Sequence, residues 1–327
     1  MVLGVNTVKH LFVINPISGG KRHKYEKTKE QIIAAMSKNG GDYEIYITQK
    51  PHDATEKVRR EAETGEELRV YACGGDGTFH ECANGCVGYN NASVTFFPCG
   101  TGNDFIKTFG DEKELFFDIE KLINGFVHPI DVIRCNDRYS INICSLGFDA
   151  RIAGDVHKYN RIPLVKGMLA YIFSLIAHFF KGINQHFTIT TGDKTQSGEY
   201  ALICTCNGKY YGGGFNPIND NMPDDGIMDT LIVKRCSRFN VIKLIGKYAT
   251  GRYREAGEIV KRYSDSRIII EADDEMAINL DGEIFRNRKA EMSMVHNGVN
   301  LLCPNGMKFF DNASENERKQ EKTEAFA

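Results

Sequence analysis

Gly74-Gly75-Asp76-Gly77-Thr78 stands between an apolar run, residues 68–73, that is typical of a buried strand, and a short helix-like segment, residues 79–85. A glycine-rich turn at such a junction presents backbone N–H groups at the start of a helix, where phosphate groups bind well. Asp76 adds a carboxylate where Mg²⁺ or a substrate hydroxyl must lie beside bound phosphates. The alternative is a tight turn that needs glycine only for its backbone conformation. We interpret the pentapeptide as a phosphate-binding loop.

The first 130 residues alternate strand-like and helix-like segments. The strand-like segments span residues 10–15, 42–48, 68–73 and 93–98, and the helix-like ones span 24–39 and 53–64. This order predicts an α/β domain with an open parallel sheet, right-handed crossovers and helices on both faces. Ligands of such sheets bind at the carboxyl ends of the strands.

Three polar loops follow strands of this predicted sheet. They are Asn15-Pro16-Ile17-Ser18-Gly19-Gly20, the loop at Gly74, and Gly100-Thr101-Gly102-Asn103-Asp104-Phe105. Because the carboxyl ends of parallel strands share one edge, the three loops together predict a phosphate site more strongly than any one of them. Asp104 brings a second carboxylate to this edge, and its alternative role is to cap the short helix that follows.

The pattern changes after residue 130. Short strand-like segments separated by turn residues predict a mainly antiparallel β-sandwich, interrupted by helix-like stretches at 162–180 and 237–251. Three acidic motifs lie in this part. Asp131 begins it, with a strand-end turn as its alternative role. Asp224-Asp225-Gly226-Ile227 offers oxygen ligands for a hard cation or forms a plain turn. Asp281-Gly282-Glu283 would equally make an Asp-Gly hairpin turn.

The composition narrows the class of protein. The 327 residues include 41 Lys and Arg against 43 Asp and Glu, which argues against a nucleic-acid partner. Ten cysteines without framework spacing, and a start without a secretory signal, predict a reducing cytoplasm. Residues 162–180 are too interrupted to span a membrane, so they predict a core helix or one that exposes apolar surface to lipid. Residues 311–327 are polar and predict a disordered tail.

In this order, the motifs resemble those of the diacylglycerol kinase catalytic family, specifically the bacterial soluble lipid kinases of the YegS/BmrU type. The resemblance covers residues 9–305. It rests on Asn15-Pro16-x-Ser18-Gly19, Gly74-Gly75-Asp76-Gly77-Thr78 with Glu81 and Asn84-Gly85, Gly100-Thr101-Gly102-Asn103-Asp104-Phe105, Ser145-Leu146-Gly147-Phe148-Asp149-Ala150, Gly212-Gly213 with Pro217 and Asp225-Gly226, and Asp281-Gly282-Glu283.

The resemblance implies an ATP-binding α/β domain over residues 1–130, completed by residues 296–310, and a lipid-substrate β-sandwich domain over residues 131–295. The nucleotide site that it implies consists of Asn15, Pro16, Ser18, Gly19, Thr48, Gly74, Gly75, Asp76, Gly77, Thr78, Glu81, Gly100, Thr101 and Asn103.

The resemblance also implies two magnesium sites and a base. Asp76 and Asp104, with Asp131, would join a carboxylate–water–Mg²⁺ network. The backbone oxygens of Met222 and Ile227 with the Asp225 carboxylate would hold a structural Mg²⁺. The base that takes the proton of the lipid hydroxyl would come from the last motif. We favour Asp281 as the essential carboxylate, and Glu283 is close enough in sequence to be the base instead.

The implied activity is ATP- and Mg²⁺-dependent phosphorylation of a lipid hydroxyl, with diacylglycerol giving phosphatidic acid in phospholipid metabolism. The enzyme would be cytoplasmic and peripherally membrane-associated, and a homodimer is left open. A NAD kinase-like enzyme shares the Gly-Gly-Asp-Gly turn, but the first loop and the later motifs weigh against it. A non-catalytic, nucleotide-responsive membrane-binding protein is the other alternative. Intact Asp76, Asp104 and Asp281 weigh against that reading.

Overall fold

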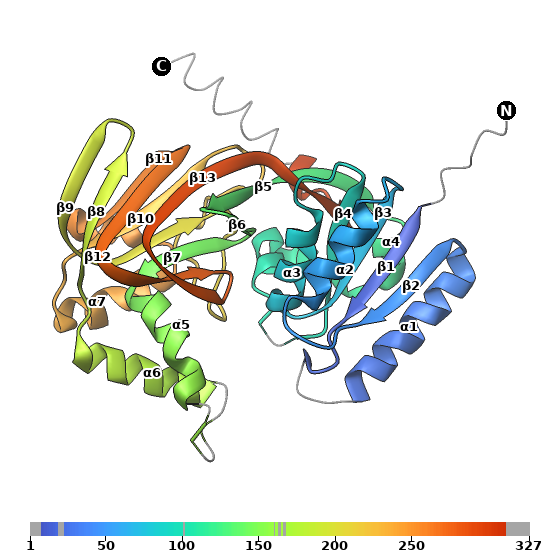
Figure 1. Cartoon of the computed structure of the whole chain (residues 1–327), viewed down its shortest axis with the longest axis horizontal. Coiled ribbons are helices and arrows are strands. Elements are labelled where there is room, and N and C mark those ends of the chain that lie inside the picture. The colour runs from blue at the N-terminus through green and yellow to red at the C-terminus, as the bar shows by residue number, and fades with distance from the viewer. Residues whose placement is uncertain are drawn as a thin grey trace. The chain divides into compact units, whose positions relative to one another are not determined.

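The computed structural model describes residues 8–18, 23–100, 102–159, 161–162, 165 and 168–311. It divides the chain into two compact units, the first formed by Met1–Pro129 with Val299–Ala327 and the second by Ile130–Gly298 (Figure 1). The two-domain plan and the antiparallel C-terminal half expected from the sequence are confirmed. Of the tail predicted over residues 311–327, only Asp311 belongs to the described residues.

The first unit is built on parallel strands. The strands β1, β2, β3 and β4 lie in the order β2-β1-β3-β4, and the end of a further strand, β13, pairs in parallel with β4. Their bounds are Lys9–Ile14, Asp42–Ile47, Leu68–Gly74, Ala92–Pro98 and Glu283–Cys303. The helices are α1 (His23–Asn39), α2 (Asp53–Ala62), α3 (Asp76–Cys86), the 3₁₀ segment η2 (Phe105–Phe117) and α4 (Ile119–Ile123).

The burial pattern of these strands explains their sequence. Every residue of β4 is buried, and in β3 only Arg69 is partly exposed. A strand that is covered on both faces has no solvent side, so it reads as a continuous apolar run without alternation. Helix α2 instead buries Ala54, Val58 and Ala62 at intervals of four residues, which is one face of a helix. The sequence pattern therefore sets which face of α2 packs inward.

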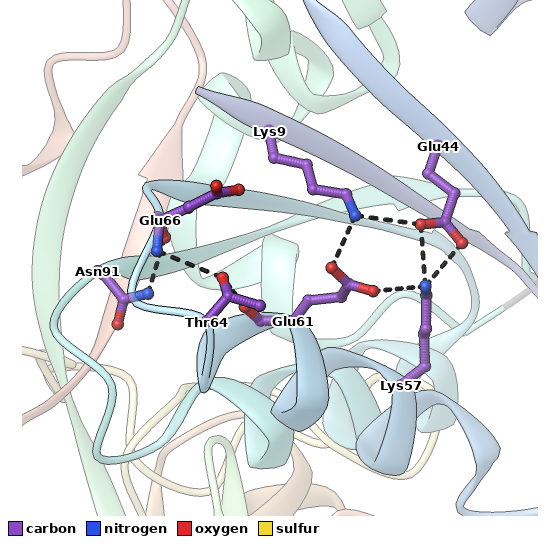
Figure 2. A network of polar contacts seen from close by, with 7 residues as sticks. All are labelled: Lys9, Glu44, Lys57, Glu61, Thr64, Glu66 and Asn91. Carbon is purple, nitrogen blue, oxygen red and sulfur yellow. Dashed lines mark hydrogen bonds and ion pairs between the residues drawn. The ribbon is translucent and has the colours of Figure 1, made fainter. Parts of the chain in front are cut away.

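A network of ion pairs holds α2 against β1 and β2 (Figure 2). The Glu61 carboxylate on α2 accepts hydrogen bonds from Lys57 at 2.6 Å and from Lys9 of β1 at 2.7 Å. Lys57 also bonds Glu44 of β2 at 2.9 Å. Burial raises the pKa of Glu61, but the hydrogen bonds from Lys57 and Lys9 outweigh burial and bring this pKa below its ordinary value. The ionised form of Glu61 therefore stabilises the folded state.

Replacing Glu61 with glutamine should lower the free energy of unfolding at neutral pH by about 1.5–3 kcal/mol, the range for hydrogen bonds to charged groups. A depressed folded-state pKa means that this contribution is present above the ordinary value of 4.5 and is lost as the pH falls through the folded value. Urea unfolding at pH 7 and pH 3 measures both effects. Glu66→Gln is the control, because Glu66 is exposed and joins the drawn network through its backbone (Figure 2). Equal stabilities of the Glu61 and Glu66 variants would refute the prediction.

The second unit is antiparallel. Its strands follow the order β11-β10-β9-β7-β12-β13, with β8 pairing β9 and β12, and β6 pairing β5. Besides β13, they are β5 (Phe126–Cys135), β6 (Arg138–Ser140), β7 (Ile143–Gly147), β8 (Gln185–Thr191), β9 (Lys194–Cys206), β10 (Met228–Lys234), β11 (Val260–Asp265) and β12 (Arg267–Leu280). The helices are α5 (Phe148–Tyr159), α6 (Met168–Lys181), α7 (Arg238–Ala249) and the 3₁₀ segment η3 (Tyr253–Ile259).

Two apolar clusters form the core of this unit. Along β10, Ile232 contributes to one cluster, whereas Leu231 and Val233 contribute to the other. This alternation follows from the two-residue period of a strand, which sends successive side chains to opposite faces. The second cluster also takes Ile152 of α5 and Tyr248 of α7, so these helices pack on that face of the sheet.

Candidate active site

In the first unit, the loop after β1 is joined to the glycine loop through Asn15. The Asn15 side-chain amide donates to the Thr78 hydroxyl at 3.2 Å, and its side-chain oxygen accepts from the backbone N–H of Ile17 at 3.2 Å. The backbone N–H of Asn15 donates to the carbonyl of Cys73 at the end of β3. These bonds place the first and second predicted loops side by side at the carboxyl ends of their strands.

The second and third predicted loops touch through their backbones. The carbonyl of Gly74 accepts from the N–H of Gly100 at 2.9 Å. A side chain at Gly100 would place its Cβ 2.7 Å from the Cα of Gly75, closer than any real contact. Gly75 is the extended residue before α3, so the turn leads directly into the helix N-terminus. Gly77 has nothing within 4 Å of its Cβ position, which leaves open space in front of that turn.

Two carboxylates lie at this junction. Oδ1 of Asp76 accepts the backbone N–H of Asp104 at 2.7 Å, and the Asp104 carboxylate pairs with Lys107 at 2.5 Å. The Phe105 ring packs 4.8 Å from the ring of Phe79 on α3, which fixes the end of the third loop. Asp76 and Asp104, the two acidic residues expected in the magnesium network of this half of the chain, are thus brought together, and Asp104 is buried.

A cavity of about 230 Å³ opens at the same sheet edge. It gathers side chains from four segments of the first unit. Five of the residues that line it were predicted to belong to the nucleotide site: Asn15, Pro16, Thr48, Thr78 and Glu81. The other lining residues are Ile17, Gln49, Lys50, Pro51 and Ala54. The predicted residues Gly19 and Thr101 lie outside the described residues, and Ser18 and Asn103 lie in the loops without lining this cavity.

The residues that the sequence analysis missed follow β2. Gln49, Lys50 and Pro51 come directly after Thr48, at the carboxyl end of that strand, so the rule that located the other loops would have found them. Buried Asp53 holds this segment by accepting the N–H of Gln49 at 2.8 Å and the Tyr46 hydroxyl at 2.9 Å. The Glu81 carboxylate accepts the N–H of Ala54 at 3.2 Å and so caps the start of α2.

In the second unit, Asp131 on β5 is fully buried and joins the turn at Gly226 to strand β13. Its Oδ1 accepts from His296 Nδ1 and from the N–H of Asn297, and its Oδ2 accepts from the N–H of Gly226, at 2.7, 2.8 and 2.7 Å. Its own N–H donates to the carbonyl of Pro223 at 2.7 Å. The structure therefore gives Asp131 a role in fixing the predicted magnesium turn.

That turn offers oxygen ligands. The Asp225 carboxylate accepts the N–H of Ile227 at 2.8 Å, while burial and the nearby carboxylates of Asp229 and Asp131 raise the pKa of Asp225 to about 6. Both side-chain amide atoms of buried Asn221, beside Met222, lack a hydrogen-bond partner among the described residues. A divalent cation bound at this turn would compensate the crowded negative charge. The donor set therefore fits Mg²⁺.

Asp281 and Gly282 form the two-residue turn between β12 and β13. Both have positive φ, 52° and 99°, as in the type I′ hairpin that Asp-Gly favours. The Asp281 carboxylate also accepts from the Ser140 hydroxyl at 2.7 Å and from the backbone N–H groups of Ile141, Asn142 and Ile143 at 2.7, 3.1 and 2.7 Å. Three of these four hydrogen bonds go to Oδ1 and one goes to Oδ2, so the Asp281 carboxylate ties the hairpin to the β6–β7 turn. Glu283 begins β13 and is partly exposed.

Comparison with known families matches both halves of the chain. The model described as the diacylglycerol kinase catalytic domain matches residues 9–135, and the one described as the YegS C-terminal NAD kinase beta sandwich-like domain matches residues 142–303. Residues 9–135 therefore belong to the diacylglycerol kinase catalytic family, and residues 142–303 carry the second domain described for YegS. The resemblance expected from the motifs is therefore confirmed. The family is one of kinases, so the protein belongs with phosphotransferases.

Individual relatives of this family agree. A protein named "putative lipid kinase" from Staphylococcus aureus strain JH9 is 28% identical over 239 residues, which are 73% of this chain and 78% of that protein. A crystal structure titled as a "putative diacylglycerol kinase" from Bacillus anthracis strain Sterne superposes with a TM-score of 0.70 at 24% identity, over 91% of this chain and 97% of the other. A diacylglycerol kinase structure from the same strain gives 0.66 at 22% identity, over 91% and 98%. At these identities the structural likeness establishes the fold alone.

Among the described residues, no helix combines the length and the apolar character needed to cross a bilayer. Helix α6 (Met168–Lys181) overlaps the stretch 162–180 and has 14 residues, whereas a membrane span needs about 20.

Proposed function

We propose that this protein is a lipid kinase that transfers the γ-phosphoryl group of ATP, with Mg²⁺, to the hydroxyl group of diacylglycerol. The observation that carries the proposal is the cavity beside the glycine loops, which gathers Asn15, Thr48 and Thr78 at the carboxyl edge of the parallel strands. The backbone N–H groups at the start of α3 would bind phosphate oxygens, and the helix dipole favours negative charge there.

The carboxylates of the two units would bind Mg²⁺ and accept the proton of the lipid hydroxyl. Asp76 and Asp104 would hold Mg²⁺ in the first unit, and the Asp225 turn would hold a structural Mg²⁺ in the second. Bound Mg²⁺ neutralises the charge of the phosphoryl group during transfer. The lipid hydroxyl needs a proton acceptor, and we assign that role to Glu283, because the four hydrogen bonds to Asp281 commit its carboxylate to the hairpin. The product would be phosphatidic acid, made by a cytoplasmic enzyme at a membrane surface.

Transfer of ³²P from γ-labelled ATP tests this function. The acceptors are diacylglycerol, phosphatidylglycerol, ceramide, sphingosine and monoacylglycerol in mixed micelles. NAD is tested in a separate tube, because the description of the second domain names NAD kinase. Labelled phosphatidic acid that requires Mg²⁺ and disappears in Glu283→Gln is the expected result. Labelled NAD without any labelled lipid would overturn the proposal, as would ATP binding without turnover on any acceptor.

A further inference from the structure

Helix α6 exposes a stripe of apolar side chains and buries polar side chains on its opposite side. Leu169, Ile172, Phe173, Ile176 and Phe180 are exposed, at intervals of three and four residues that form one stripe along the helix. The opposite side buries Ser174 and His178, which bond Ile152 and Asp155 of the neighbouring α5 (Figure 1). A helix on a water-facing surface normally has the reverse arrangement, so the outer side of α6 is suited to a non-aqueous partner.

Helix α7 extends this surface. Phe239, Ile242 and Ile245 are exposed on it, the first two at 73% and 66%. The Arg238 guanidinium at the start of α7 donates to the carbonyls of Phe179 and Phe180 at the end of α6, both at 2.8 Å, so the two helices meet there. We call the eight exposed side chains of α6 and α7 the α6–α7 face. They are eight of the sixteen exposed large apolar side chains in the part of the chain that the structure describes.

The charged side chains on α6 and α7 themselves are all basic. Neither helix contains an aspartate or a glutamate, and their lysines and arginine are Lys181, Arg238, Lys243 and Lys247. Lys181 and Lys243 are exposed, whereas Lys247 pairs with Glu255 at 3.3 Å. A second copy docked face to face would bring these cations together, which is unfavourable. An anionic lipid surface complements both the apolar stripe and the cations.

The apolar character continues beneath the surface. A cavity of about 130 Å³ in this unit is lined mostly by apolar side chains, among them Leu175 of α6 and Val241, Leu244 and Ile245 of α7. Ile245 belongs both to this lining and to the α6–α7 face. We propose that the α6–α7 face docks onto an anionic lipid bilayer. The inference rests on the proposed function in one respect, that the acceptor is a lipid held in the bilayer.

Vesicle sedimentation tests the docking. The full chain is mixed with phosphatidylcholine vesicles that do or do not contain phosphatidylglycerol, at low and high salt. Binding should require phosphatidylglycerol and weaken with salt, because the lysines meet charged headgroups. Phe239→Glu and Ile176→Glu should each lower the bound fraction at least ten-fold, and Lys181→Glu should lower it roughly five-fold or more per unit of charge. Ile33→Glu, at an exposed position on α1 in the first unit, should bind like the wild type.

Kinase assays separate docking from catalysis. The face variants should phosphorylate diacylglycerol in detergent micelles at the wild-type rate and lose activity only on vesicles. Wild-type protein that stays in the supernatant with anionic vesicles would overturn the docking proposal. A wild-type dimer in solution that Phe239→Glu dissociates would overturn it too, since a second copy would then occupy the face. Vesicle binding without phosphorylation of any lipid would support docking and refute the proposed function.

Discussion

Glu283→Gln should lower the turnover of the lipid kinase reaction by a factor of about 10² to 10⁴, the range over which a general base contributes. Glutamine keeps the shape of the side chain and cannot accept the proton of the lipid hydroxyl. Since Glu283 is partly exposed at the start of β13, the free energy of unfolding should change by less than about 1 kcal/mol. The turnover number is measured with saturating ATP as a function of pH. In the wild type, turnover should fall at low pH as the base becomes protonated, and this fall should be absent from the residual activity of the variant.

Asp281→Asn is the matched change of carboxylate to amide two residues earlier. In asparagine an NH₂ group replaces one of the two Asp281 oxygens, and it cannot accept the hydrogen bonds that this oxygen now receives. The donors left unpaired should lower the free energy of unfolding by about 1–3 kcal/mol. Its activity should fall together with the fraction folded and keep the fall in turnover at low pH. If Asp281→Asn were fully stable and inactive while Glu283→Gln remained active, the two roles would have to be exchanged.

Gly100→Ala should weaken the binding of MgATP at least ten-fold. The new Cβ would lie 2.7 Å from the Cα of Gly75 and 3.3 Å from its N, and both are backbone atoms that cannot rotate away. The two glycine loops must therefore separate, which displaces the N–H groups at the start of α3 from the positions that bind phosphate. Overpacking of this kind also costs about 1–3 kcal/mol of stability. Calorimetric titration with MgATP, on protein shown to be folded, measures the affinity.

Gly246→Ala is the control for this prediction. Gly246 lies within α7 with nothing within 4 Å of its Cβ position, so alanine should fit there and leave nucleotide affinity unchanged. Alanine also has the higher helix propensity, so this variant should be as stable as the wild type or slightly more stable. A Gly100→Ala protein that binds MgATP within two-fold of the wild type would show that the contact between the loops does not shape the nucleotide site.

The sequence by itself determined the architecture and the chemical class. The apolar runs of β3 and β4 and the four-residue spacing on α2 reflect short-range periodicity, which depends on the chain's own geometry and burial. The glycine loops were found for the same reason, because each directly follows a strand. Their order along the chain identified the family, which the domain matches confirm.

Only the tertiary structure decided how individual side chains are used. Asp281 and Glu283 are both carboxylates of one short motif, so the sequence does not tell their roles apart. The hydrogen bonds that distinguish Asp281 come from Ser140 to Ile143, about 140 residues away in the chain. The outward stripe of α6 could not be separated from a core helix, because an apolar face does not say whether anything packs on it. Burial of Ser174 and His178 against α5 settled that question. Periodicity is local, whereas hydrogen-bond partners and the covering of a helix face depend on contacts between distant parts of the chain.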